Sequence, residues 1–94
     1  MLLAIDIGNT NIKYGIYNGE DLVASFRVSS RLSRTADEYG SVLINLLASK
    51  VLKTFDVTGV IMSSVIPSLN YTICHMCEYF FGVSPLMVGP GIKT

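Results

Sequence analysis

Residues 2–11 read Leu-Leu-Ala-Ile-Asp-Ile-Gly-Asn-Thr-Asn, an apolar run that ends in a carboxylate and continues directly into a polar turn. A near-continuous apolar run such as Leu2 to Ile7 is typical of a strand that is buried on both faces of a sheet. Gly8 can adopt a positive φ and lets a ligand approach the backbone closely. The polar residues after it offer amide and hydroxyl groups for hydrogen bonds. We therefore expect a buried strand followed by a loop with the chemistry of an anion site.

The carboxylate of Asp6, at the end of this strand, has two interpretations. It could hold Mg²⁺, which would in turn bridge nucleotide phosphates, because a carboxylate and a phosphate repel each other directly. The alternative is an ordinary tight turn in which Asp6 and Asn9 bond to neighbouring backbone amides. Short motifs of this kind also arise by chance, so these six residues alone leave both interpretations open.

The composition describes one small domain of 94 residues with an unusually apolar character. Half of the residues are hydrophobic and 15% are charged, against about 25% charged in an average soluble domain. We therefore expect part of the apolar surface to face a partner chain or another part of the same protein. The formal net charge is zero, which argues against nucleic acid as a partner. The apolar runs are too short to span a membrane.

The cysteines and the N-terminus indicate a cytoplasmic location. The N-terminus lacks a basic segment and Asp6 interrupts its apolar stretch, so a signal peptide is not expected. Two cysteines without a secretory signal are typical of a reducing compartment. The segment Cys74-His-Met-Cys77 has fewer ligands than a structural zinc site needs. We expect core cysteines with a surface His75 there, and no metal.

The chain opens with a pattern typical of an antiparallel meander. From Asn11 to Tyr17 the residues alternate, with Ile12, Tyr14 and Ile16 on one face. Asn18-Gly19 is the strongest hairpin signal in the chain, and Leu22 to Val28 returns as a third strand.

After the third expected strand, the spacing of the apolar residues changes to the period of a helix. Thr35-Ala-Asp-Glu38 is a capping box, and it predicts a helix to about Ser49. A second helix is expected from Pro67 or Ser68 to Gly82. The predicted inward positions of the two helices are Tyr39, Val42, Leu43, Leu46 and Leu47, then Ile73, Met76, Cys77 and Phe80. Short strands are expected at Val60 to Ser63 and at Leu86 to Val88.

The element order is therefore βββαβαβ, and right-handed crossovers place the first strand in the middle of the sheet. The predicted fold is α/β, a ribonuclease-H-like mixed five-stranded sheet of strand order 3-2-1-4-5 with helices packed on it, as in the actin and sugar-kinase superfamily. Ligands collect at the carboxyl ends of such parallel strands. Asp6, Ser63-Ser64 and Gly89-Pro90-Gly91 all fall at this edge, which favours the phosphate-loop interpretation.

Two sets of polar residues have more than one interpretation. Ser63 and Ser64 could line a cleft or could bond to the start of the following helix. Arg27, Arg31 and Arg34 cluster between the third strand and the first helix. Their guanidinium groups could bind an anion, or they could belong to a solvated loop or a subunit contact.

Four blocks in the same order carry a resemblance to a known family. They are Asp6-Ile-Gly-Asn-Thr-Asn11, Arg34-Thr-Ala-Asp-Glu-Tyr-Gly40, Ser63-Ser-Val-Ile-Pro67 and Val88-Gly-Pro-Gly-Ile-Lys-Thr94. With these blocks the chain resembles type III pantothenate kinases over essentially its whole length. Members of that family are more than twice as long, so we expect residues 1–94 to be a single N-terminal ATP-binding half-domain of a larger two-domain kinase.

The resemblance implies transfer of a phosphoryl group from ATP to the primary hydroxyl of pantothenate, the first step towards coenzyme A. It also implies a cytoplasmic homodimer that needs Mg²⁺ and a monovalent cation, K⁺ or NH₄⁺. The implied ATP- and phosphate-binding residues are Asp6, Ile7, Gly8, Asn9, Thr10, Asn11, Ile12 and Lys13, with Mg²⁺ held at Asp6 through water. A weaker expectation places the substrate cleft at Ser63, Ser64, Gly89, Pro90 and Gly91. Lys13 could reach nucleotide oxygens or could simply be solvated.

The catalytic base of the family is the aspartate of a Gly-Ala-Asp-Arg segment, which is expected shortly after Thr94 and does not occur in this chain. The polypeptide is therefore expected to be inactive without the missing C-terminal half. One alternative is a non-catalytic relative of the Bvg accessory factor type, linked to transcriptional regulation. Another is a kinase for a different small hydroxyl acceptor, such as a sugar.

Overall fold

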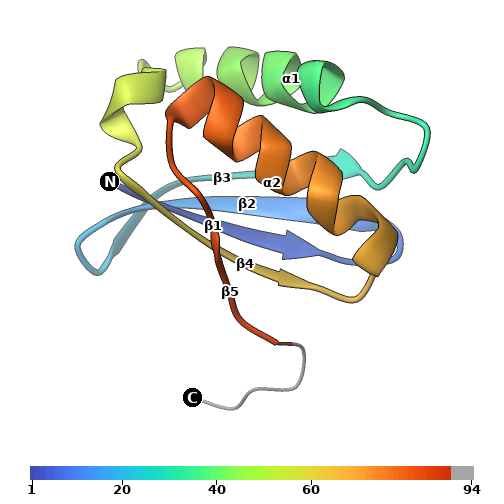
Figure 1. Cartoon of the computed structure of the whole chain (residues 1–94). Helices are drawn as coiled ribbons and strands as arrows, with labels where there is room; N and C mark the ends of the chain where they lie inside the picture. The colour runs from blue at the N-terminus through green and yellow to red at the C-terminus, as the bar shows by residue number, and fades with distance from the viewer. Residues whose placement is uncertain (90–94) are drawn as a thin grey trace.

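The computed structural model describes residues 1–89, which form one mixed sheet in the order β3-β2-β1-β4-β5 with two helices (Figure 1). β1 pairs with β2 in antiparallel and with β4 in parallel orientation, and β4 pairs with β5 in parallel. The predicted fold class and strand order are confirmed. The elements are β1 (Leu2–Ile7), β2 (Asn11–Asn18), β3 (Asp21–Ser29), α1 (Ala36–Ala48), the 3-10 helix η1 (Thr54–Asp56), β4 (Gly59–Ser64), α2 (Pro67–Phe81) and β5 (Leu86–Met87).

Local signals explain where these elements begin and end. Gly19 has φ +63° in the tight turn between β2 and β3, so the hairpin prediction is confirmed. At the start of α1, the Glu38 N–H donates to Thr35 Oγ1 over 3.1 Å, and the Thr35 N–H donates to Glu38 Oε1 over 2.8 Å. These hydrogen bonds with Thr35 lower the pKa of the Glu38 carboxyl. α2 starts with Pro67 in its first turn and ends at Gly82, whose φ is +68°.

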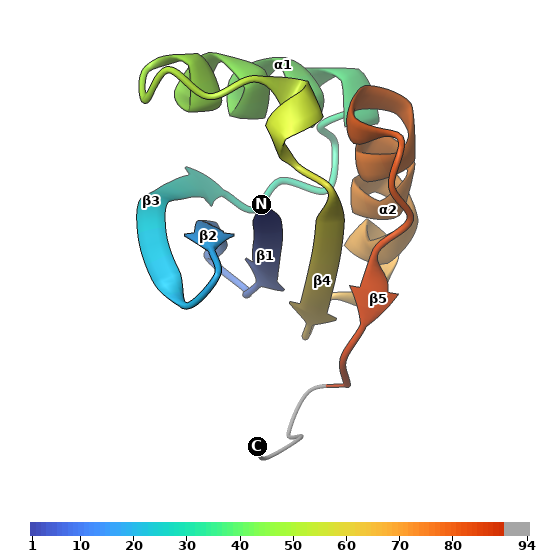
Figure 2. The ribbon, with the colours of Figure 1, turned by 90° about the vertical axis from the view of Figure 1, so that its left-hand side faces the viewer.

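Both helices cover the same face of the sheet, and the core lies between them and that face (Figures 1 and 2). The predicted face of β2 is confirmed, since Ile12, Tyr14 and Ile16 are all buried. The helices contribute Tyr39, Leu43 and Leu47 from α1 and Leu69, Ile73, Met76 and Cys77 from α2. None of the helices within residues 1–89 is both long and apolar enough to cross a bilayer.

The inward stripe of α1 differs from the prediction at two positions. Val42 is exposed and Leu46 is only half-buried. Gly40 is buried instead, and a Cβ atom added there would lie 2.1 Å from the Phe80 ring of α2. α1 therefore approaches α2 through a residue without a side chain, and this contact turns Val42 away from the core.

The expectation that β1 is buried on both faces is wrong for the described part of the chain. Leu3, Ile5 and Ile7 are buried, whereas Leu2 and Ala4 are half-buried and Asp6 is exposed. The cause is that α1 and α2 lie on one side of the sheet (Figure 2). We call the other side, with Leu2, Ala4 and Asp6, the open face.

Two buried tyrosines provide a test of this core. The Tyr14 hydroxyl is buried with no hydrogen-bond partner among residues 1–89, and burial raises its pKa. The Tyr39 hydroxyl accepts from the Arg31 N–H over 2.9 Å and donates to the Arg31 carbonyl over 2.8 Å. Tyr14→Phe is expected to raise the free energy of unfolding by about 1 kcal/mol, and Tyr39→Phe to lower it by about 1–2 kcal/mol.

Urea denaturation of both variants measures the difference. Each variant loses only one oxygen atom from a buried ring, so each is the control for the other. Equal destabilisation by the two substitutions would contradict the hydrogen-bond assignment.

Candidate functional site

The sheet register places four polar side chains in one row across four strands. Arg27 of β3 lies opposite Lys13 of β2, Lys13 lies opposite Asp6 of β1, and Asp6 lies opposite Ser63 of β4. Asp6, Lys13 and Arg27 are exposed and Ser63 is half-buried, so the row runs along the open face. Residues that are far apart in sequence thus meet because neighbouring strands lie only about 4.8 Å apart.

Asp6 lies in the middle of this row. The Ser63 hydroxyl donates to Asp6 Oδ1 over 3.2 Å and so orients the carboxylate. A hollow of about 280 Å³ lies beside Asp6, between β2 and β4, and Lys13 and Ser63 also line it. The carboxylate is therefore held in place, open to solvent and next to a cation, an arrangement that suits a metal–phosphate site.

The loop between β1 and β2 is braced by hydrogen bonds. The Gly8 N–H donates to the Asn11 carbonyl over 2.9 Å. The Ser30 hydroxyl donates to the Gly8 carbonyl over 2.7 Å, and the Ser30 N–H donates to the Thr10 carbonyl over 3.0 Å. Asn9 and Thr10 are exposed between these anchors. The sequence interpretation missed Ser30; the signal was its position just after β3, opposite the loop in the predicted meander.

Gly8 suits this loop for a reason other than a positive φ. Its φ is not positive, because the glycines of residues 1–89 with positive φ are Gly19 and Gly82. A Cβ atom at Gly8 would lie 3.1 Å from the Asn11 carbonyl oxygen. Glycine therefore serves the close approach of the two ends of the loop, and not a left-handed backbone.

Several of the predicted site residues point elsewhere. Ile7 and Ile12 have fully buried side chains, so only their main-chain atoms could reach a ligand. Ser64 is 7% exposed and its Oγ accepts from the Ile66 N–H over 3.0 Å, next to the start of α2. The serine pair is thus divided, with Ser63 on the open face and Ser64 in the helix approach. Gly89 is exposed beyond β5, and Pro90 and Gly91 lie outside the described residues.

The three arginines between β2 and α1 lie in different surroundings. Arg27 lies within β3 and faces Lys13. Arg34 lies over the ring of Tyr39, with its guanidinium carbon 5.3 Å from the ring centre, a cation–π contact. Arg31 holds the Tyr39 hydroxyl through its backbone. Arg27 therefore belongs to the open face, while Arg31 and Arg34 contact a tyrosine of the helix-covered core.

The cysteines and the histidine of α2 face different sides of the helix. Cys77 is buried, and burial raises the pKa of its thiol to about 12 and also raises that of Cys74. His75 is exposed and stacks between Tyr71 and Tyr79, with ring centres 6.0 and 6.5 Å apart. Within residues 1–89, no three acidic, cysteine or histidine side chains gather as metal ligands.

The family model of type III pantothenate kinases matches residues 2–94. The chain belongs to this family. The resemblance carried by the four sequence blocks is therefore confirmed over the whole chain.

Similar solved structures support the same fold. A ROK hexokinase from Thermus thermophilus is 12% identical, with a TM-score of 0.69 over 94% of this chain. An N-acetylglucosamine kinase assigned in Porphyromonas gingivalis is 16% identical, with a TM-score of 0.65 over 95% of this chain. At these identities the likeness shows the fold alone. The chain spans about a third of each structure, 34% in both cases.

The brace on the loop is testable through Ser30. Ser30→Ala removes the hydrogen bond to the Gly8 carbonyl and is expected to lower the free energy of unfolding by about 1 kcal/mol. Amide hydrogen exchange of Gly8 and Asn11 should become faster. Ser29→Ala is the matched control, because Ser29 is the exposed residue directly before Ser30, at the end of β3. Exchange that stays unchanged in Ser30→Ala would show that the loop does not depend on this bond.

Proposed function

We propose that this chain binds the phosphates of ATP and forms the nucleotide-binding part of a pantothenate kinase. The observation that carries the proposal is the exposed carboxylate of Asp6, fixed by Ser63 at the carboxyl end of the central strand beside a braced glycine loop. Membership of the type III pantothenate kinase family supports both the reaction class and the acceptor.

The residues present fit a magnesium ion held largely by the nucleotide. Mg²⁺ commonly keeps several waters and binds one or two carboxylates together with substrate phosphates. Asp6 supplies one carboxylate oriented by Ser63, and the other described residues that line its hollow are not acidic. When bound, Mg²⁺ would neutralise charge on the phosphate oxygens.

The loop and Lys13 supply the remaining phosphate contacts in this proposal. Asn9 and Thr10 are exposed at the tip of the loop, where their N–H, amide and hydroxyl groups can donate to phosphate oxygens. Lys13 lies directly opposite Asp6 in the register, so its ammonium group adds positive charge at the same hollow. Phosphoryl transfer depends mainly on such positioning and charge neutralisation.

In the proposed reaction the hydroxyl oxygen of pantothenate forms a bond to the γ-phosphorus of ATP. The bond from this phosphorus to the β–γ bridging oxygen breaks, and ADP leaves with that electron pair. The hydroxyl proton passes to a base, which we assign to the part of the kinase outside this chain. The chain therefore binds and orients the nucleotide but does not complete the reaction by itself.

The other partners of the proposal come from family membership. They are pantothenate as acceptor, a monovalent cation such as K⁺ or NH₄⁺, a second subunit of a homodimer, and the remaining half of the kinase in the cytoplasm. The exposed apolar side chains of the chain, among them Leu32, Phe55 and Leu86, are available for such contacts.

Nucleotide binding is tested on the 94-residue chain with Asp6→Asn. The substitution keeps the shape of the side chain but removes the charge that would hold Mg²⁺. Calorimetric titration with ATP should show a strong dependence on Mg²⁺ in the wild type, and Asp6→Asn should lose most of it. Asp21→Asn is the matched control, since it removes an exposed carboxylate at the β2–β3 hairpin. Equal effects of both variants would contradict the assignment of Asp6.

Catalysis is tested on the whole kinase that contains this chain, by measuring ADP release that depends on pantothenate in the presence of Mg²⁺ and K⁺. Asp6→Asn should reduce turnover on the order of 100-fold or more. A folded whole protein that binds ATP but shows no pantothenate-dependent turnover would refute the acceptor and favour a non-catalytic relative or another hydroxyl substrate.

A further inference from the structure

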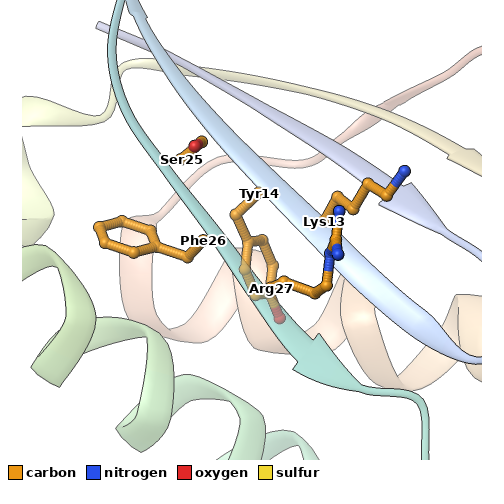
Figure 3. A pocket seen from close by; sticks show the side chains of 5 residues that line it. All are labelled: Lys13, Tyr14, Ser25, Phe26 and Arg27. Carbon is orange, nitrogen blue, oxygen red and sulfur yellow. The ribbon is translucent and has the colours of Figure 1, made fainter.

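A second hollow adjoins the Asp6 hollow on the other side of Lys13. It measures about 300 Å³, lies over β2 and β3, and is lined by Lys13, Tyr14, Ser25, Phe26 and Arg27 (Figure 3). Lys13 belongs to both hollows. The two spaces are therefore neighbours on the open face, and one cation stands between them.

The charged side chains of this hollow point away from the core. Figure 3 shows Lys13 and Arg27 on one side of the β2–β3 pair, while Tyr14 extends towards the helices. Tyr14 is buried, whereas Lys13 and Arg27 are exposed. The open side of the hollow is thus formed by an ammonium and a guanidinium group.

The two cations face each other on neighbouring strands, where their repulsion lowers the stability of the sheet. Lys13 and Arg27 are direct cross-strand partners, and like charges in such positions destabilise a sheet. Their neighbours on the same face are neutral: Ser25 and Ser29 along β3, and Asn11 and Gly15 along β2. The acidic member of the row is Asp6, which is the direct cross-strand partner of Lys13 and lies two strands away from Arg27. One carboxylate therefore faces two cations, and the row keeps a net positive charge at Arg27.

We propose that Lys13 and Arg27 form a phosphate-binding clamp on the open face. A guanidinium group presents paired N–H donors that match two oxygens of a phosphate, and an ammonium group adds a compact positive charge. Adjacent strands bring the two groups close enough to share one anion. Arg27 would be a binding residue that the sequence motifs do not include.

The anion is a phosphate group, and it has two possible sources. One is the outer phosphate of the nucleotide that occupies the Asp6 hollow, and this source rests on the proposed function. The other is free phosphate or a phosphorylated product, which needs no nucleotide. The clamp itself rests only on the register and charges of β2 and β3.

The clamp is tested by titrating the 94-residue chain with pyrophosphate, without metal and at low ionic strength, and following amide NMR shifts. Arg27→Gln is expected to weaken binding about three- to tenfold, which is the loss of one partly exposed charge-assisted contact. Arg27→Lys keeps the charge but loses the paired donors, so it should bind more weakly than the wild type. Lys50→Gln removes one positive charge from the turn after α1 and should bind normally.

The unfolding temperature of Arg27→Gln shows whether Arg27 binds a ligand or stabilises the fold. Without phosphate, Arg27→Gln should unfold at the same temperature as the wild type or slightly higher, because a repulsion is removed. Pyrophosphate should raise the unfolding temperature less in Arg27→Gln than in the wild type. The clamp is refuted if Arg27→Gln binds pyrophosphate like the wild type, or if Lys50→Gln loses as much affinity.

A second experiment identifies the source of the bound phosphate. It also distinguishes failure of the clamp from failure of the proposed nucleotide site. If the nucleotide supplies the phosphate, Arg27→Gln should weaken binding of ATP with Mg²⁺ more than binding of ADP with Mg²⁺. Equal effects on the two nucleotides, together with weakened pyrophosphate binding, assign the clamp to free phosphate or product. Asp6→Asn removes a carboxylate that repels phosphate, so it should leave metal-free pyrophosphate binding unchanged or strengthen it. Failure of the nucleotide site and failure of the clamp therefore give different results.

Discussion

The alternation of side chains along β1 is the constraint on which the rest of the structure depends. β1 is paired on both sides, to β2 and to β4, so its register cannot slip without breaking two ladders. Ile5 and Ile7 point into the core between the sheet and the helices, and this forces Asp6 onto the opposite, open face. The same burial that stabilises the domain therefore determines where its central carboxylate is exposed.

The register of the sheet extends this effect from one residue to a row. Because Asp6 is opposite Lys13 and Lys13 is opposite Arg27, two cations and one carboxylate share the open face. Ser63 orients the carboxylate from the other side, and Ser30 braces the loop from the end of β3. Each of these contacts joins separate parts of the chain, so the candidate site forms only when β1, β2, β3 and β4 have come together.

Much of the fold followed from local signals, because turns and helix caps are made by neighbouring residues. The hairpin at Asn18-Gly19, the capping box at Thr35 and the stop at Gly82 were all predicted and are all present. The predictions failed where packing between distant elements decided the result. Val42 follows the helical period but is turned outward by the contact between Gly40 and Phe80. The apolar run of β1 has no helix on its second face within residues 1–89.

The sequence by itself determined the element order, the strand order, the family and the motif that contains Asp6, since these depend on short-range patterns and on the preferred hand of crossovers. Only the tertiary structure decided which polar residues meet. It placed Ser63 and Ser64 in different surroundings, set Arg27 opposite Lys13, and brought Ser30 to the Gly8 carbonyl. The physical reason is that cross-strand register and helix packing join residues distant in sequence, and no local pattern encodes those distances.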